Sequence, residues 1–560
     1  MFKKTNKNIQ GDLFSGVPLI LEGNSLKQYN DTSSWHNQFY KQIALRIDES
    51  VFKVLYSKKI GAPNSSISLL VSMMIIKEAF GWSDLQLFER CRFDLLTRSA
   101  LGLYNLNDKI PTESTYYLFR KRVHQYNREY KEDLFQKTFE TITQEQIKEF
   151  KVDGKSIRMD SKLFGSNIAW YSRYEIIQKT FVLFCKILTP KDLLIFSKND
   201  RQEIEYLLKE EPLKTVYHST KEDIQKRMMA LGLIISKALL PFKNRNTEEY
   251  KLLQRVFNEQ YKLEGKKQRN VLLRPKEEIS ADSVQSPHDP DSSFRHKGDQ
   301  KIKGYSANVT ETVSEGLNLI TNVKVDKSNT SDTDFVIPGI IASQKITETT
   351  VEKVYADGAY QTPRNDSFCR DIDMVFTGIQ GAISRYDLEM TDKGLMVTDT
   401  KTGKQTLAVL ARKNKNSRED RWVISIDKKR IYFSPKSIRS AIKRKTMMQR
   451  PIEELNKRNN VEATIYNLCC KLRNGKSKYR GLGKNQTWAI CRCLWVNLVR
   501  IIHLSEQTFR RNGQKAKKSA LLFYFWIISI LDGVYNRKRS QIAFYFVGTI
   551  CCNQFLTDPF

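Results

Sequence analysis

Apolar positions recur at helical spacing through residues 35–145. The pattern predicts a helix over residues 67–80 that Gly81 ends, and a second amphipathic helix over residues 83–91. A third helix begins after Pro111 and carries several cations. Short helices with a basic one last can form a DNA-reading module of helix-turn-helix type, or an ordinary bundle with a solvated basic face.

Near residue 150 the spacing changes to the alternation typical of strands. Residues 151–161 are consistent with a short hairpin that turns at Asp153 and Gly154. Beyond residue 300 strands and one helix alternate. The predicted elements are a hairpin of strands 304–313 and 319–325, a helix at 332–345, and strands at 351–356 and 374–377. This order predicts an interrupted α/β domain.

Two interruptions stand out in that domain. Residues 165–275 return to a helical pattern, and residues 394–434 consist of strand-like pieces that predict an all-β insertion. Residues 276–301 are polar and predict an irregular loop. The predicted parts are an arm at 1–34, an all-α domain at 35–148, an α/β domain at 149–515 with a helical insertion at about 165–275 and a β insertion at about 380–435, and an apolar tail at 516–560.

The charge balance predicts a polyanionic partner. The 560 residues include 93 Lys and Arg against 62 Asp and Glu, a net charge of +31. Residues 401–520 hold 31 basic and 7 acidic residues, so +24 of the excess lies there. The longest apolar run, residues 521–531, is shorter than the about 20 residues that span a bilayer. We therefore expect nucleic acid as the partner, and no membrane.

The cysteines and the amino terminus indicate a compartment. The nine cysteines are scattered, and none has the spacing of a zinc site, which favours reduced thiols. The first residues include lysines but no apolar stretch of signal-peptide length. Both observations predict a cytoplasmic protein, and the charge predicts that it associates with the nucleoid.

Three acidic residues have positions that suit metal chemistry. Asp160 ends the predicted strand 156–159, Asp357 follows an apolar strand, and Glu462 lies on a helix expected to begin near Pro451. Carboxylates that converge repel one another unless a cation lies between them, and Mg²⁺ or Mn²⁺ prefers such oxygen ligands. Two such ions could drive an in-line displacement at phosphorus. Taken alone, an acidic residue at a strand end is usually a turn or cap residue, and Glu462 could simply pair with Arg458.

Basic side chains beside glycines are candidates for DNA contact. A loop after the Glu462 helix alternates cations with glycines, which predicts contact with phosphates or a solvated, mobile loop. The polar loop at 276–301 and the basic helix after Pro111 offer further cations. The candidates are Lys476, Lys478, Tyr479, Arg480 and Lys484 in or beside the glycine-rich loop, Arg295 and Lys297 in the polar loop, Arg120 and Arg122 on the helix, and Arg458 beside Glu462.

Several segments, in order along residues 35–505, resemble the DDE-type transposases of bacterial insertion sequences. They are WSDLQLFERCRFDLLTRSALG at 82–102, PTESTYYLFRKRV at 111–123, IRMDSKLFGSN at 157–167, DPDSSFRHKGDQKIKGY at 289–305, YADGAY at 355–360, and RNNVEAT with GKSKYRG within 458–481. The resemblance implies a ribonuclease-H-like catalytic core with a β-rich insertion, preceded by an all-α domain.

The resemblance also implies site roles. The family would assign Asp160, Asp357 and Glu462 as the triad that binds Mg²⁺ or Mn²⁺ as two ions. In its Tyr-x2-Arg-x3-Glu-x6-Lys signature, Arg458 and Glu462 match, whereas the tyrosine and lysine positions hold Leu455 and Cys469. That departure leaves the triad intact and puts a tyrosine and lysine contribution to DNA-end handling in doubt.

These implications give three functional hypotheses. The first is a transposase that binds the terminal inverted repeats of its element, cuts the DNA at its ends and joins them to target DNA, as a homodimer on DNA. The second is a non-catalytic, sequence-specific DNA-binding protein derived from a transposase. The third is a nuclease or RNA-processing enzyme of the same fold.

Overall fold

The computed structural model describes residues 1–5, 20–57, 60–264, 270–379, 385–411, 420–426 and 429–507. The chain divides into a compact unit, Met1–Arg500, and a second unit, Ile501–Phe560. The predicted apolar tail at 516–560 lies outside the described residues, and the predicted domain boundaries stay predictions. Every described cysteine is a free thiol.

The amino-terminal part is helical, as its spacing predicts. The Ser66 side chain accepts a hydrogen bond from the Leu69 amide to cap one helix, and Gly81 ends it with a left-handed φ of 73°. Ser83 and Gln86 form a capping box for the next. The elements are α1 Gly23–Asn30, inside the predicted arm, α2 Trp35–Gln42, η1 Ala44–Arg46, η2 Glu49–Leu55, α3 Ile67–Phe80, α4 Asp84–Phe93, α5 Leu95–Ala100, α6 Glu113–Tyr130 and α7 Leu134–Phe150.

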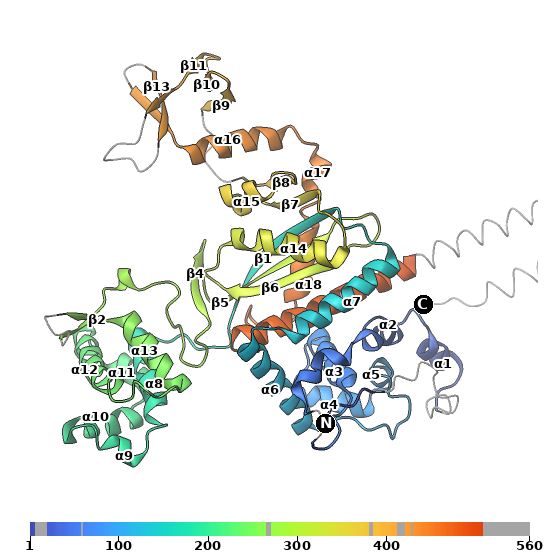
Figure 1. Cartoon of the computed structure of the whole chain (residues 1–560), viewed down its shortest axis with the longest axis vertical. Coiled ribbons are helices and arrows are strands. Elements are labelled where there is room, and N and C mark those ends of the chain that lie inside the picture. Colours follow the sequence, from blue (N-terminus) through green and yellow to red (C-terminus); the bar gives the residue numbers. More distant parts are fainter. Residues whose placement is uncertain are drawn as a thin grey trace, which may run out of the picture. The chain divides into compact units, whose positions relative to one another are not determined.

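A mixed six-stranded sheet forms the centre of the next region (Figure 1). Its order is β4-β5-β1-β7-β8, and β6 pairs with β5. Strand β1 is antiparallel to β5 and parallel to β7, which is parallel to β8. The bounds are β1 Ser156–Gly165, β4 Ser293–Lys297, β5 Gln300–Thr312, β6 Ile320–Lys327, β7 Lys353–Asp357 and β8 Asp373–Thr377.

Three predictions about this sheet need correction. Residues 151–161 do not form a hairpin, because Lys151 ends α7 in a left-handed conformation (φ 51°) and the chain then enters β1 directly. Strand β1 continues to Gly165 because β5 pairs with it along that length, so Asp160 lies inside the strand rather than at its end. The polar segment at 276–301 is also not wholly irregular. It contains η3 Lys276–Glu278 and strand β4, which β5 holds by backbone pairing.

Helices cover both faces of the sheet. Helix α14 Val336–Thr347, which follows η4 Asp332–Phe335, lies along the sheet (Figure 1). Its Val336 and Ile340 pack in one core with Ile157 and Met159 of β1. The alternate residues of β1 face the opposite side. There lie α18 Asn460–Cys469 and the last described helix, Leu482–Gln507, whose Trp488 packs on Phe164 of β1.

The last described helix also covers the edge of β6. The Gln486 side chain accepts from the Val325 amide (2.6 Å) and donates to the Val323 carbonyl (2.8 Å), and Asn497 bonds both backbone groups of Ile320. Among the described residues, this helix is the one long and apolar enough to cross a membrane, and 72% of its apolar stretch is buried. Such burial is typical of a core helix.

The helical interruption between β1 and β4 has its own apolar core, which includes Phe181, Ile235 and Leu253. The helices that the pattern of residues 165–275 predicts are present, and a hairpin that the pattern did not predict follows them. The elements are α8 Arg173–Cys185, α9 Pro190–Leu193, α10 Lys198–Lys209, α11 Pro212–His218, α12 Lys221–Leu239, α13 Glu248–Gln260, β2 Tyr261–Glu264 and β3 Asn270–Leu273.

After β8 the chain forms two small three-stranded antiparallel sheets, where the pattern predicts strands. The first of these strands, β9, precedes the predicted strand region at 394–434 and was not predicted. The remaining elements are η5 Gly358–Tyr360, α15 Pro363–Phe368, β9 Tyr386–Thr391, β10 Gly394–Asp399, β11 Gln405–Leu407, β12 Val409–Ala411, β13 Arg421–Ile426, β14 Lys429–Phe433, α16 Pro435–Met448 and α17 Ile452–Asn456.

Candidate active site

The three acidic residues singled out in the sequence come together around one point. Strands β1 and β7 are parallel neighbours that pair Arg158 with Tyr355, and the same offset brings Asp160 level with Asp357. Asp357 ends β7, and its carboxylate accepts from the Ala359 amide (3.2 Å). Glu462 lies in the first turn of α18, the helix that packs on β1.

Arg458 joins all three carboxylates. Its Nη2 lies 3.0 Å from Asp160 Oδ2 and 3.9 Å from Asp357 Oδ2, and its Nη1 lies 2.8 Å from Glu462 Oε1. The helix expected to begin near Pro451 is broken here, because α17 ends at Asn456 and α18 begins at Asn460. Arg458 therefore lies in the connection, where its guanidinium reaches both the sheet and the helix.

The three carboxylates differ in their exposure to solvent. The side chain of Asp160 is 17% exposed, that of Asp357 41% and that of Glu462 64%. Burial raises the pKa of Asp160 above its usual value, and the nearby Asp357 and Glu462 raise it further. Arg458 and the Ser161 amide oppose that rise. The carboxylate of Asp160 is thus costly to keep ionised without a cation beside it.

The donor set has the chemistry of a hard-cation site. Three carboxylates supply oxygen ligands of the kind that Mg²⁺ and Mn²⁺ prefer. In the part of the chain that the structure describes, no three His, Cys, Asp or Glu side chains lie close enough together to hold an ion. At this site the Arg458 guanidinium lies within 4 Å of all three carboxylates and supplies positive charge.

A buried ionic network that the sequence did not predict lies under α18. Glu311 of β5 is fully buried, with Oε1 at 2.5 Å from Arg158 Nε and Oε2 at 2.8 Å from Arg500 Nη1. The Thr464 hydroxyl of α18 donates to the same carboxylate (2.7 Å). Arg158 also donates to the Lys457 carbonyl (3.1 Å), next to Arg458. The network fixes α18 and its connection on the sheet. The only sequence signal is that Glu311 stands where the alternation of the predicted strand 304–313 would put an apolar residue.

The glycine-rich basic loop after α18 is bound to its surroundings rather than free. Its backbone joins the end of β1, since the Gly165 amide donates to Gly475 and the Ser477 amide donates to Gly165, each at 2.8 Å. Arg480 Nε donates to the Asn167 carbonyl (2.7 Å), and Lys478 Nζ contacts the Trp82 carbonyl (3.2 Å). The side chains of the loop's lysines and of Arg480 remain exposed beside β1.

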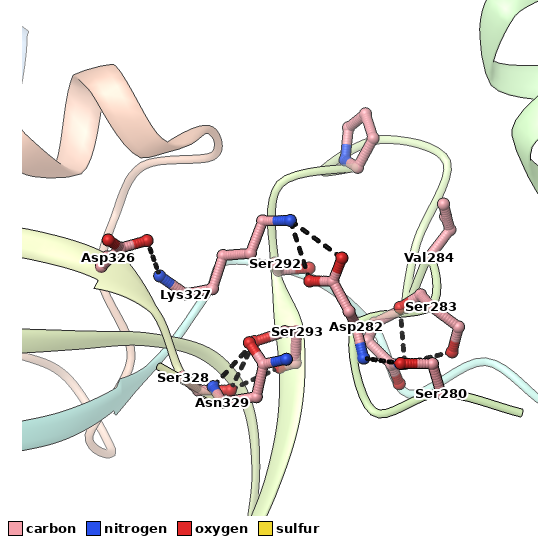
Figure 2. Close-up of polar contacts among 12 residues, drawn as sticks. Ser280, Asp282, Ser283, Val284, Ser292, Ser293, Asp326, Lys327, Ser328 and Asn329 are labelled. Carbon is pink, nitrogen blue, oxygen red and sulfur yellow. Dashed lines mark hydrogen bonds and ion pairs between the residues drawn. The ribbon is translucent and has the colours of Figure 1, made fainter. Parts of the chain in front are cut away.

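Acidic residues of the polar loop at 276–301 hold that basic loop. Asp289 is buried and accepts from the Tyr305 hydroxyl (2.6 Å) and the Gly481 amide (3.0 Å), and Asp291 accepts from the Leu482 amide (3.0 Å). Figure 2 shows how the polar loop is itself tied to β6. There Lys327 Nζ reaches both carboxylate oxygens of Asp282 at 2.8 and 3.1 Å.

The same close-up shows the start of β4 fixed to the end of β6. The hydroxyls of Ser293 and Ser328 lie 2.9 Å apart, and the Asn329 amide donates to Ser293 Oγ (3.0 Å) (Figure 2). These contacts explain why a segment with loop-like composition enters the sheet.

Tyr479 connects the basic loop to the amino-terminal helices. Its hydroxyl donates to Glu78 Oε1 and accepts from Lys77 Nζ (3.2 Å), both on α3. Arg120 of α6 lies over the Tyr479 ring, 5.8 Å from the centroid. Burial raises the pKa of Glu78, so this carboxylate depends on such partners.

We expect Tyr479→Phe to lower the free energy of unfolding by about 1–3 kcal/mol, because it leaves the buried Glu78 carboxylate without its hydroxyl donor. Urea unfolding followed by circular dichroism measures the change. Tyr466→Phe is the matched control, since that side chain is 71% exposed. Equal midpoints for the two variants would show that the Glu78 contact contributes nothing.

The remaining candidates lie outside the acidic cluster, which consists of Asp160, Asp357 and Glu462. Arg120 pairs with Asp84 (3.4 Å), and Arg122 lies over the Tyr56 ring at 5.7 Å. Arg295 and Lys297 are in strand β4, not in a loop, and Arg295 donates to the Thr330 carbonyl (2.9 Å).

Lys484 follows the basic loop, at the start of the last described helix. It lines a small cavity with His124, Arg120, Glu78 and Tyr479. Burial, together with the charges of Lys484 and Arg120, lowers the pKa of His124 to about 4. The imidazole is therefore neutral at pH 7, and this cavity adds no further cation.

Comparison with known proteins adds one family. Residues 27–122 match the model of a family described as Transposase domain (DUF772). This match supports a transposase. It covers α2 to α5 and much of α6, which lie outside the acidic cluster, and it indicates an enzyme that processes nucleic acid. No curated protein and no solved structure matches the chain.

Proposed function

We propose that this protein is a DDE transposase that binds the terminal inverted repeats of its insertion sequence and catalyses metal-dependent strand cleavage and strand transfer. The observation that carries the proposal is the convergence of Asp160, Asp357 and Glu462 on Arg458, from two parallel strands and a packed helix. The transposase-domain match at residues 27–122 and the charge of +31 agree with it.

The topology supports the ribonuclease-H-like part of the proposal. Three antiparallel strands, β6, β5 and β1, are followed by two strands parallel to β1, and the acidic residues lie on β1 and at the end of β7. A β-strand insertion precedes the helix that supplies Glu462. These features are what the sequence resemblance implies for the catalytic core.

In this proposal Asp160, Asp357 and Glu462 hold Mg²⁺ or Mn²⁺, as two ions. The bound metal would activate water or a 3′-hydroxyl and stabilise the leaving oxygen of the phosphodiester. Asp160 is the most buried ligand and fixes the inner end of the site, whereas Glu462 faces the solvent from which DNA arrives. Arg458 orients the carboxylates and can bind a phosphate oxygen with its two-pronged guanidinium.

The partners follow from the same proposal. The DNA ends and the target would bind the exposed cations of the basic loop, with Lys476, Lys478 and Arg480 nearest the end of β1. The protein would act as a homodimer on DNA, in the cytoplasm and on the nucleoid.

Cleavage of the DNA that borders the coding region tests the function. Duplexes from both borders are incubated with the purified full chain and Mg²⁺, with a chelator as control, and strand cuts and joined products are resolved on gels. Cuts at inverted repeats together with joined products support the transposase. Binding without cleavage in Mg²⁺ or Mn²⁺ would instead indicate the non-catalytic DNA-binding protein, and hydrolysis without joining would indicate a nuclease.

A further inference from the structure

Strand β1 carries a cation next to the acidic cluster that the sequence reasoning did not consider. Lys162 is two residues beyond Asp160, so the two side chains leave the strand on the same face, about 7 Å apart along it. The Lys162 side chain is exposed. Within the described part of the chain its ammonium makes no ion pair or hydrogen bond, unlike Arg158 and Arg458 on the same side of the sheet.

The helix that supplies Glu462 passes this lysine. Cys469 follows Glu462 by seven residues, two turns along the same side of α18. Burial raises the pKa of the Cys469 thiol to about 11, and the charge of Lys162 is the largest effect that opposes the rise. Lys162 and Cys469 thus lie on two elements that pack together, β1 and α18, and Cys469 itself offers no charge to a phosphate.

Farther along, β1 meets the basic loop. The strand ends at Gly165, which pairs with the loop backbone at Lys476. Lys476 Nζ reaches back to the Ile168 carbonyl (3.4 Å), and its side chain is exposed. One side of the strand therefore carries Asp160, then Lys162, and then leads to the cations of the basic loop.

We propose that Lys162 binds the DNA phosphate next to the one that reacts, so that the DNA backbone leaves the acidic cluster along β1 toward the basic loop. The inference rests on the proposed function for the location of the reacting phosphate. A lysine ammonium suits this task because it is a compact charge on a flexible stem and can follow a phosphate without fixed geometry. Because the Lys162 ammonium has no partner among the described residues, its whole charge can act on the ligand.

The salt dependence of DNA binding tests the proposal. Affinity for a fluorescent duplex from the border of the coding region is measured by anisotropy over a salt series, without divalent metal. Each contacted phosphate adds about 0.9 to the slope of log Kobs against log[salt]. Lys162→Gln should therefore flatten the slope by about 0.9, and Lys162→Gln/Cys469→Lys should recover it by returning the charge from the helix.

Lys324→Gln is the matched control. Lys324 is an exposed lysine of β6 that pairs with Asn308, which pairs with Ser161, so it lies on the opposite face of the same sheet. The Lys324→Gln variant should give the same slope of log Kobs against log[salt] as the parent. A parent-like slope for Lys162→Gln, an equal fall for Lys324→Gln, or no recovery in the double variant would overturn the proposal. A parent that binds DNA but does not cut it would overturn the proposed function instead, with the slopes unaffected.

Discussion

Cleavage of end-containing DNA should fall by more than about 100-fold in Asp160→Asn, Asp357→Asn and Glu462→Gln, each tested alone. Loss of an outer-shell partner of a metal site already costs about 10–100-fold, and these residues are the proposed ligands themselves. Each amide keeps the shape of the acid it replaces and removes the negative charge that would hold the metal. Gel-resolved cleavage in Mg²⁺ measures the effect.

Binding of the same DNA should survive these changes. A carboxylate repels phosphate, so its removal leaves the basic surface intact and separates a loss of chemistry from a loss of affinity. Glu453→Gln is the matched control, because Glu453 is an exposed acid in the first turn of α17, close in sequence to Arg458. The triad assignment is wrong if the three variants cleave as fast as Glu453→Gln.

Glu311→Ala should lower the free energy of unfolding by about 3–5 kcal/mol, the range expected when one partner of a buried ion pair is removed. The change would leave the guanidinium of Arg158, which is 5% exposed, without its carboxylate, and Arg500 without one of its partners. It would also remove the acceptor of the Thr464 hydroxyl and so loosen α18. Urea or thermal unfolding of the full chain measures the difference.

A second acid of the same hairpin provides the comparison for Glu311. Glu315 is exposed in the turn between β5 and β6, so Glu315→Ala should unfold at the parent's midpoint. Because Arg158 also donates to the Lys457 carbonyl, loss of the network should also disturb the neighbouring Arg458 and the acidic cluster that it contacts. A Glu311→Ala protein as stable as Glu315→Ala would mean that the network does not carry the packing of α18.

Local signals in the sequence predict the elements well. The Ser83 capping box, the left-handed Gly81, the alternation of β5 and the apolar run of β7 depend on neighbouring residues alone. The convergence of Asp160, Asp357 and Glu462 could also be anticipated, since it needs only the order of the strands and one packed helix. The position of Asp160 inside β1 could not, because the length of that strand is set by its pairing with β5.

The remaining features depend on contacts between distant segments. Arg158 and Glu311 are 153 residues apart, and they become a pair only once β1 and β5 are in register. The composition of the basic loop suggests a mobile segment that binds phosphate. Asp289 and Asp291, about 190 residues away in the sequence, nevertheless fix its backbone. The break between α17 and α18, which brings Arg458 to the carboxylates, likewise has no glycine or proline to announce it.

The side-chain amides of Gln486 and Asn497 have a consequence for assembly. They use backbone donors and acceptors of β6 at Ile320, Val323 and Val325 that an added strand would need. That side of the sheet is therefore closed to strand exchange with a second molecule. Two copies that met along this edge would have to join through side-chain surfaces, so their separation would not unpair any residue of β6.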